Sequence, residues 1–232
     1  MIDVTILVSS SPIPSNPSTE IINQMMWSVR GHFPDSKIVI MCDGMPDAIS
    51  SPSRLTAYSG FKEQIKGRFG NCRVLEFDHH VNQAGMLERG LAEVDTPLLA
   101  YFEHDWTFHH GIEWDKIGAT IIGGIFNVVR LYMNCRISPF HEGMMFDRVI
   151  HDGVPYIHTS QWSQNPHVAL TSKYREWADK YVKGRNGSPI EDCLHSPCAC
   201  GPWENWKVAI YNPIHDSSMG MVKHLDGRQG ER

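Results

Sequence analysis

A short polar run, Glu103, His104, Asp105 and Trp106, directly follows the apolar residues 98–102. Carboxylates at the end of a buried strand are partly desolvated, which is costly unless they serve a ligand. Carboxylate oxygens are the ligands that Mg²⁺ and Mn²⁺ prefer, and these ions often share their coordination with substrate phosphates. The run therefore predicts a divalent-cation site for a diphosphate-bearing substrate. The alternative is an exposed turn in which Asp105 caps local structure.

A second group of reactive side chains is Cys193, His195, Cys198 and Cys200. These are four potential zinc ligands, but their spacing is tighter than in known zinc sites, which favours buried or loop thiols over a metal site. The six cysteines of the chain could form three disulfides. A chain long enough to build its own core does not need them, so we expect mostly reduced thiols.

The elements that must position these residues alternate along the first half of the chain. Short β-branched runs predict buried strands, and apolar residues at helical spacing predict helices between them. The predicted strands are 4–8, 37–41, 73–77 and 98–102, and the predicted helices are 21–29, 55–66 and 83–94. This alternation predicts an α/β, Rossmann-like fold with a mostly parallel central sheet covered on both faces. Ligands of such sheets bind at the carboxyl ends of the strands, where Asp105 lies.

The second half is less regular, because six prolines between residues 155 and 213 divide it into short pieces. One or two strands are predicted within 121–133, a helix at 171–181 and a late strand at 208–211. Neither an internal repeat nor a linker is visible, so we expect one domain over residues 1–232.

The stretch that leads into the polar run resembles the segment before the DxD motif of GT-A glycosyltransferases, especially those of family 2. The residues that carry the resemblance are Asn82, Gly85, Gly90, Leu91, Thr96, Pro97 and Glu103 to Asp105. The resemblance implies a GT-A fold in which Asp105 binds the metal. The pattern departs from DxD at Glu103 and His104, which are then expected to contact the donor.

The resemblance extends to both ends of the chain. It implies donor contacts from Ser9, Ser10 and Pro12 after the first strand, and from Asp43 after the second. Near the C-terminus, several GT-A enzymes bring a late histidine to the metal, which here implies His224.

Basic residues beside that histidine, Lys223 and Arg228, are implied to neutralise the donor's diphosphate. The alternative is a surface histidine among charged neighbours.

Residues 190–192 resemble the xED motif of inverting GT-A enzymes. The resemblance implies that Asp192 is the general base that removes the acceptor's hydroxyl proton, with Glu191 holding the acceptor or the loop. The alternative is an acidic helix start after Ser188 and Pro189.

A weaker resemblance, to a loop that lines the sugar and acceptor cleft, implies acceptor contacts from Trp162, Asn165 and His167. The alternative for Trp162 is an ordinary core position.

Taken together, the resemblance implies an inverting glycosyltransferase that depends on Mn²⁺ or Mg²⁺. Residues 1–108 would bind the nucleoside-diphosphate sugar, and residues 109–232 would bind a hydroxyl-bearing acceptor such as a glycan, a small molecule or a hydroxymethylated DNA base. Two alternatives stay open, a nucleotidyltransferase of the same fold class and a noncatalytic carbohydrate-binding relative. Residues 9–16 lack the Gly-rich basic loop usual in nucleotidyltransferases.

Composition limits the remaining classes. A formal net charge of −5 argues against nucleic-acid binding through accumulated Lys and Arg. No run of about 18 apolar residues predicts a transmembrane segment, and the N-terminus lacks a secretory signal pattern. The default expectation is a cytoplasmic location, or the host cytoplasm for a viral protein.

Overall fold

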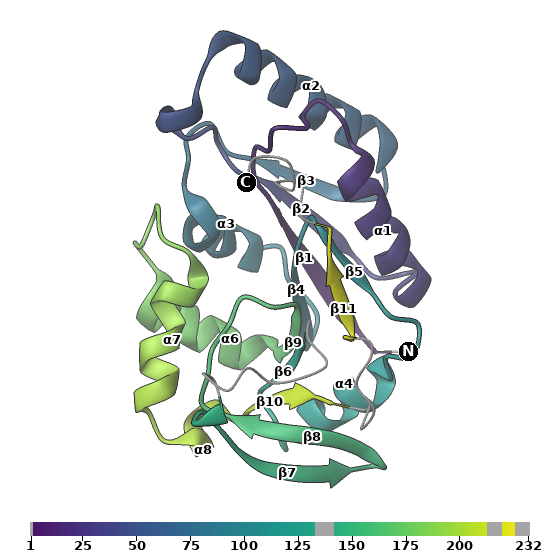
Figure 1. Ribbon diagram of the computed structural model, residues 1–232, viewed down its shortest axis with the longest axis vertical. Coiled ribbons are helices and arrows are strands. Elements are labelled where there is room, and N and C mark those ends of the chain that lie inside the picture. Colours follow the sequence, from purple (N-terminus) through teal and green to yellow (C-terminus); the bar gives the residue numbers. More distant parts are fainter. Residues whose placement is uncertain (1, 133–141, 213–219, 226–232) are drawn as a thin grey trace.

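The computed structural model describes residues 2–132, 142–212 and 220–225. In the first half of the chain, strands and helices alternate (Figure 1). Its strands are β1 (Val4–Ser10), β2 (Ile38–Cys42), β3 (Arg73–Glu76), β4 (Leu98–Glu103) and β5 (Trp106–Phe108), and its α-helices are α1 (Glu20–His32), α2 (Pro52–Arg68), α3 (Asn82–Leu91) and α4 (Trp114–Ile122). A short 3₁₀ turn, Asp47–Ile49, precedes α2.

The second half adds strands to the same sheet and three further α-helices among the described residues. Its strands are β6 (Val128–Leu131), β7 (Met145–His151), β8 (Val154–Thr159), β9 (His167–Leu170), β10 (Val208–Tyr211) and β11 (Val222–His224), and its helices are α6 (Thr171–Trp177), α7 (Ile190–Cys200) and α8 (Trp203–Trp206). A π-helical turn, Ala178–Val182, continues α6.

Among the described residues, nine strands form one sheet in the order β3-β2-β1-β4-β9-β6-β10-β8-β7. Only β9 and β8 run against the common direction, so the sheet is mostly parallel, as predicted. The chain winds outward from β1 to β2 and β3, then returns to place β4 on the other side of β1. This reversal creates a topological switch point, and ligands of open α/β sheets bind beyond the carboxyl ends of the strands at such a point.

Helices cover the first strands of the sheet on both faces, because alternate residues of a strand point to opposite sides. In β1, Ile6 and Val8 pack with residues of α1, α2 and α4, whereas Leu7 packs with residues of α3, α6 and α7. The whole of β1 is buried, as expected of a central parallel strand.

Helix α1 turns one apolar face to this core. Its buried residues are Ile22, Met25, Met26 and Val29, the helical spacing that the sequence predicts.

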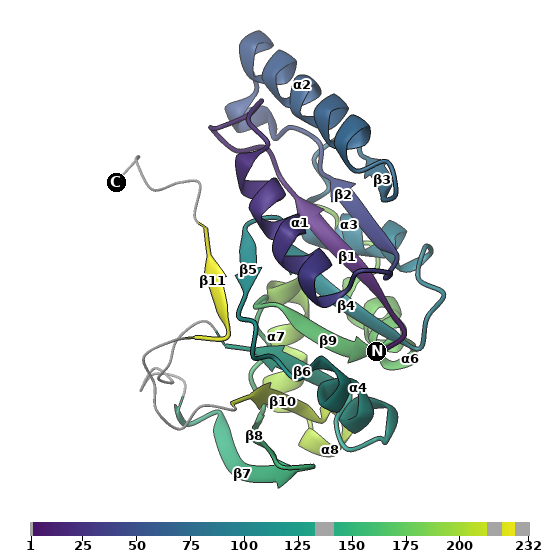
Figure 2. The ribbon, with the colours of Figure 1, turned by 90° about the vertical axis from the view of Figure 1, so that its right-hand side faces the viewer.

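A two-stranded ribbon stands apart from the main sheet. After β4 the chain turns at His104 and Asp105 into β5, which pairs antiparallel with β11. The other edge of β5 contacts α1, where the Phe108 backbone N–H donates to Ser28 Oγ over 2.8 Å. Figure 2 shows α1, β5 and β11 side by side along one flank of the molecule. The ribbon therefore carries residues from late in the chain to the carboxyl end of β4.

The largest departures from the predicted elements lie in the second half. Of the one or two strands predicted within 121–133, the structure shows β6 (Val128–Leu131), whereas Ile121 belongs to α4 and faces the core. The β7–β8 hairpin turns at Asp152 and Gly153, whose φ angles of 50° and 75° suit a tight hairpin turn. Within the described parts of the chain, no helix is long and apolar enough to cross a membrane.

Candidate metal centre and its surroundings

Three metal-ligating side chains meet beyond the carboxyl end of β4. Glu103 ends β4, Asp105 lies in the turn to β5, and His224 ends β11. One ligand atom from each lies within 4.8 Å of the others. The Leu225 N–H donates to the Asp105 carbonyl oxygen over 2.7 Å, which fixes the end of β11 against the turn. The structure thus brings Asp105 and His224 together, and it adds Glu103, which sequence analysis assigned to the donor.

The environment of Asp105 keeps its carboxylate ionised. Burial alone would raise its pKa, but the hydrogen bond from His224 and the charges of His104 and His224 outweigh burial and lower the pKa. His224 Nε2 lies 3.0 Å from Asp105 Oδ2. In the described part of the chain, the buried Oδ1 of Asp105 has no hydrogen-bond partner. A buried ionised oxygen without a partner is costly, so this atom fits a cation ligand.

The three side chains fit a divalent cation by their chemistry. Two carboxylates suit the hard ions Mg²⁺ and Mn²⁺, and an imidazole nitrogen favours the transition metal of the two. The three residues are each half-buried, so an ion bound there would remain open to a substrate on one side.

Gln83, in the first turn of α3, connects this cluster to another helix. Its Nε2 donates to Glu103 Oε1 over 2.7 Å, and its Oε1 accepts from the Ile190 N–H, the first of α7, over 3.3 Å. The side chain therefore orients a candidate ligand and fixes the N-terminus of α7 beside it. Gln83 could not be recognised from the sequence, because a single amide in a predicted helix carries no motif.

The acidic pair Glu191 and Asp192 lies in the first turn of α7, next to the residue that Gln83 holds. Glu191 Oε2 accepts from the Gln164 N–H over 3.1 Å, so Glu191 fixes the 160–166 loop. Asp192 is exposed. Glu191 and Asp192 thus form an acidic helix start, and the same helix is linked to the metal cluster through Gln83. The catalytic role of Asp192 stays a prediction.

Asp43, which was predicted to contact the donor, has a fully buried side chain. Its Oδ1 accepts from the Val81 N–H over 2.9 Å, and its Oδ2 from the Asn82 N–H over 3.2 Å. His80 Nδ1 lies 2.7 Å from Oδ2. Asp43 therefore holds the segment that leads into α3 and does not present its carboxylate to a nucleotide.

Three further residues that were predicted to contact the donor are also buried. Ser9 and Ser10 lie inside β1, with exposed fractions of 3% and 0%, and the His104 side chain is 5% exposed. The His104 N–H donates to the Ser9 carbonyl oxygen over 2.9 Å, which continues the β1–β4 pairing beyond the strand. Of the predicted residues after β1, Pro12 is partly exposed and remains a candidate.

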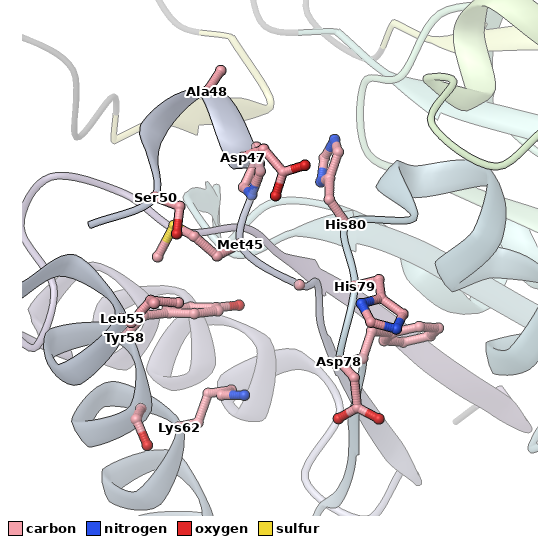
Figure 3. A pocket seen from close by; sticks show the side chains of 14 residues that line it. Met45, Asp47, Ala48, Ser50, Leu55, Tyr58, Lys62, Asp78, His79 and His80 are labelled. Carbon is pink, nitrogen blue, oxygen red and sulfur yellow. The ribbon is translucent and has the colours of Figure 1, made fainter. Parts of the chain in front are cut away.

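A pocket of about 920 Å³ opens next to these strands, between α2 and the loops that follow β2 and β3 (Figure 3). Its lining includes the side chains of Tyr58, Lys62, His79 and His80. Tyr58 Oη donates to the Asp43 carbonyl oxygen over 2.9 Å. The volume lies within the range of roughly 300–1,000 Å³ typical of small-molecule sites. The pocket lies at the carboxyl ends of β2 and β3, on the ligand-binding edge of the sheet.

Two residues of the predicted acceptor loop are fully buried. Trp162 is fully buried and packs against Tyr174, Trp177 and Trp206, so it is a core residue that cannot stack on a sugar. His167, on β9, is also fully buried, with Nε2 3.0 Å from Tyr174 Oη. Asn165 is partly exposed and remains a candidate.

The cysteine-rich helix holds no metal cluster among the described residues. Cys193 and Cys198 are buried, Cys200 is exposed, and His195 Nδ1 lies 2.8 Å from the Trp162 carbonyl oxygen.

Of the two predicted phosphate-binding residues, Lys223 is exposed on β11 beside His224. Arg228 lies outside the described residues.

No protein-family model and no curated protein matches the chain. Solved structures do. S. aureus TarS 1-349, also solved with UDP-GlcNAc, has a TM-score of 0.55 and 12% identity over 92% of this chain and 59% of its own. GalNAc-T7 with UDP, GalNAc and Mn²⁺ has a TM-score of 0.60 and 11% identity over 98% of this chain and 45% of its own.

A nucleotidyl transferase from Methanothermobacter has a TM-score of 0.53 and 10% identity over 90% of this chain and 86% of its own. Identities this low show a common fold and leave activity open. The fold is that of the GT-A glycosyltransferase structures, and this chain spans about three fifths or less of the TarS and GalNAc-T7 chains.

Proposed function

We propose that the chain is a metal-dependent, inverting glycosyltransferase that transfers a sugar from a nucleoside diphosphate to a hydroxyl acceptor. The observation that carries the proposal is the meeting of Glu103, Asp105 and His224 beyond the carboxyl end of β4. In a sheet of this topology, that position is where a substrate diphosphate would lie. The similar structures with UDP-GlcNAc, or with UDP and Mn²⁺, support a nucleotide-sugar donor.

In this proposal each residue of the cluster has a definite task. Asp105 and His224, with Glu103, would hold Mn²⁺ or Mg²⁺, which would supply positive charge against the departing diphosphate. Gln83 orients Glu103 by its 2.7 Å hydrogen bond. Lys223, exposed on β11 beside His224, supplies a further positive charge for the phosphates.

The nucleoside part of the donor is assigned to the pocket of Figure 3. His79 offers aromatic surface there, and Lys62 and His80 offer hydrogen-bond donors. Pro12 is kept as a donor contact in this proposal, because it follows β1, which lies between β2 and β4.

Asp192 is assigned the role of general base. It is exposed in the first turn of α7, and Gln83 contacts both this helix and the metal cluster. A carboxylate can remove the proton of a weakly nucleophilic hydroxyl when that proton is transferred in the transition state. Direct attack from one face of the sugar, with the diphosphate leaving from the other, inverts the anomeric configuration. Asn165 and Glu191 would then border the acceptor.

Paired substitutions test the assignment. Asp105→Asn should lose both Mn²⁺ binding and donor binding, whereas Asp192→Asn should keep both and lose transfer. Asp179→Asn, an exposed carboxylate on the π-helical turn, is the matched control. The assay is metal-dependent release of nucleoside diphosphate from a panel of nucleotide sugars, together with the melting temperature. Full turnover by the first two variants would contradict the proposal.

A nucleotidyltransferase is the second candidate, because the chain covers 86% of the Methanothermobacter enzyme, more than of the glycosyltransferase chains. Against it, residues 9–16 contain no Gly, Lys or Arg to cradle a triphosphate. The products separate the two candidates. Pyrophosphate released from a nucleoside triphosphate and a sugar phosphate would indicate nucleotidyl transfer.

A further inference from the structure

A shallow groove of about 730 Å³ lies outside the metal cluster, along the outer face of α1. Its residues come from α1 and the segment before it, from α2 and from β5. They are Ser18, Thr19, Glu20, Asn23, Gln24, Trp27, Gln64 and Thr107. The groove thus lies on the flank of the molecule where α1 and β5 run side by side (Figure 2).

Trp27 is the feature that needs an explanation. Its side chain is 84% exposed, the highest value among the exposed large apolar residues of the described chain. It lies on the side of α1 opposite the core residues Met25, Met26 and Val29, so it does not stabilise the fold by burial. An indole exposed to water contributes no hydrophobic free energy to the fold. That free energy would be gained if a ligand covered the indole, which favours a ligand-binding role for Trp27.

The neighbours of Trp27 define the chemistry of that ligand. Glu20, Asn23, Gln24 and Trp27 share one side of α1 through their spacing of three, four and seven residues. The remaining lining groups are hydroxyls and the Gln64 amide, so Glu20 is the one formally charged side chain in the lining of this groove.

An aromatic face surrounded by amides and hydroxyls is complementary to a sugar, whose ring offers a C–H face and many hydroxyls. The π-face carries partial negative charge that attracts C–H groups, and the amides both donate to and accept from hydroxyls. A nucleic acid or an anionic lipid would instead require clustered Lys or Arg. The lining therefore favours a neutral glycan.

The position of the groove relates it to the metal cluster. Thr107 lies on β5, two residues after Asp105, a separation of roughly 7 Å along an extended strand. We propose that this groove binds an oligosaccharide. The bound part would be a segment of the acceptor glycan that lies some distance from the end that receives the sugar. The inference rests on the proposed function and narrows its acceptor to a carbohydrate chain.

The test measures glycan binding without metal or donor. Neutral hexasaccharides of the cello-, malto-, laminari-, xylo- and chito-series are titrated calorimetrically, and soluble polysaccharides are included in native gels. At least one series should bind the parent protein, and Trp27→Ala should weaken that binding about tenfold or more. Trp27→Phe should retain most of it, because the aromatic face remains. Ile122→Ala, a change of an exposed apolar residue on α4, is the matched control.

Each outcome decides the inference separately from the proposed function. Binding that is equal in the parent and Trp27→Ala, or absent in every series, overturns the groove assignment, even if donor turnover is intact. Trp27-dependent binding without donor turnover keeps the groove and contradicts the transferase. A change in molar mass caused by Trp27→Ala, without any effect on glycans, would identify a contact between copies of the chain and overturn the inference.

Discussion

Replacing Gln83 by methionine tests whether the candidate metal centre is held together as the structure indicates. Methionine has a similar length but cannot donate to Glu103 or accept from the Ile190 N–H, so both bonds of 2.7 and 3.3 Å are lost. Glu103 then loses a charge-assisted hydrogen bond, and a neighbouring helix loses its contact with the cluster. The ligands themselves are unchanged. Any loss of metal affinity in this variant would therefore result from a change in the orientation of Glu103.

The expected magnitude follows from similar supporting hydrogen bonds. Losing such a partner typically weakens metal binding by about 10- to 100-fold. This corresponds to about 1.4–2.7 kcal/mol of binding free energy. For a chain of this size, about 2–4 °C of melting temperature accompanies each kcal/mol. The Mn²⁺-induced rise in melting temperature should therefore be smaller by roughly 3–11 °C in Gln83→Met, at Mn²⁺ concentrations well above both dissociation constants.

The assay is thermal unfolding with and without Mn²⁺, scored as the difference between the two melting temperatures so that a general loss of stability cancels. Gln24→Met, an exposed glutamine on α1, is the control and should keep the full Mn²⁺ effect. An identical Mn²⁺-induced rise in Gln83→Met and the parent would refute the assignment of Glu103 to the metal.

Three further predictions concern stability. Trp162→Ala should destabilise the fold by about 3–5 kcal/mol in urea unfolding, because it empties a core position; a small effect would restore a surface role. Burial lowers the pKa of His167 to about 4, so the folded state takes up its proton only far below pH 6.5. The free energy of unfolding should therefore be highest above pH 6.5 and fall by up to about 3 kcal/mol toward pH 4. In a series of denaturant titrations at different pH values, His167→Gln should reduce this fall. An unchanged pH dependence in the variant would contradict the prediction. Gly44→Ala should lower the melting temperature because its Cβ would collide with the His79 backbone, whereas Gly31→Ala, with free space around it, should not; equal effects would argue against the close approach.

The first half of the fold could be predicted because its pattern is local. β1 and β2 are fully buried and mostly apolar, and the core face of α1 has helical spacing, so local pattern identifies them. The β7–β8 hairpin was missed although Asp152 and Gly153 form a typical hairpin turn pair.

The site was predictable only in part, because its residues meet through the tertiary structure. Asp105 and His224 were paired through a family resemblance, and no local pattern connects β5 with β11. Gln83 could not be identified, since an amide acquires its role only when α3 and α7 converge. The sequence left two interpretations of Trp162 open, because a tryptophan beside polar residues suits both a sugar site and a core, and only burial distinguishes them.

The arrangement of β11 has a thermodynamic consequence. Among the residues that the structure describes, this strand pairs only with β5, and it supplies one of the three candidate ligands. Pairing of β11 with β5 and cation binding at the candidate metal centre are therefore thermodynamically coupled. A cation coordinated by His224 would stabilise the paired form of β11, and pairing of β11 would strengthen cation binding by the same free energy. Hydrogen exchange at the β11 amides would then act as a gauge of cation concentration, even in the absence of any substrate.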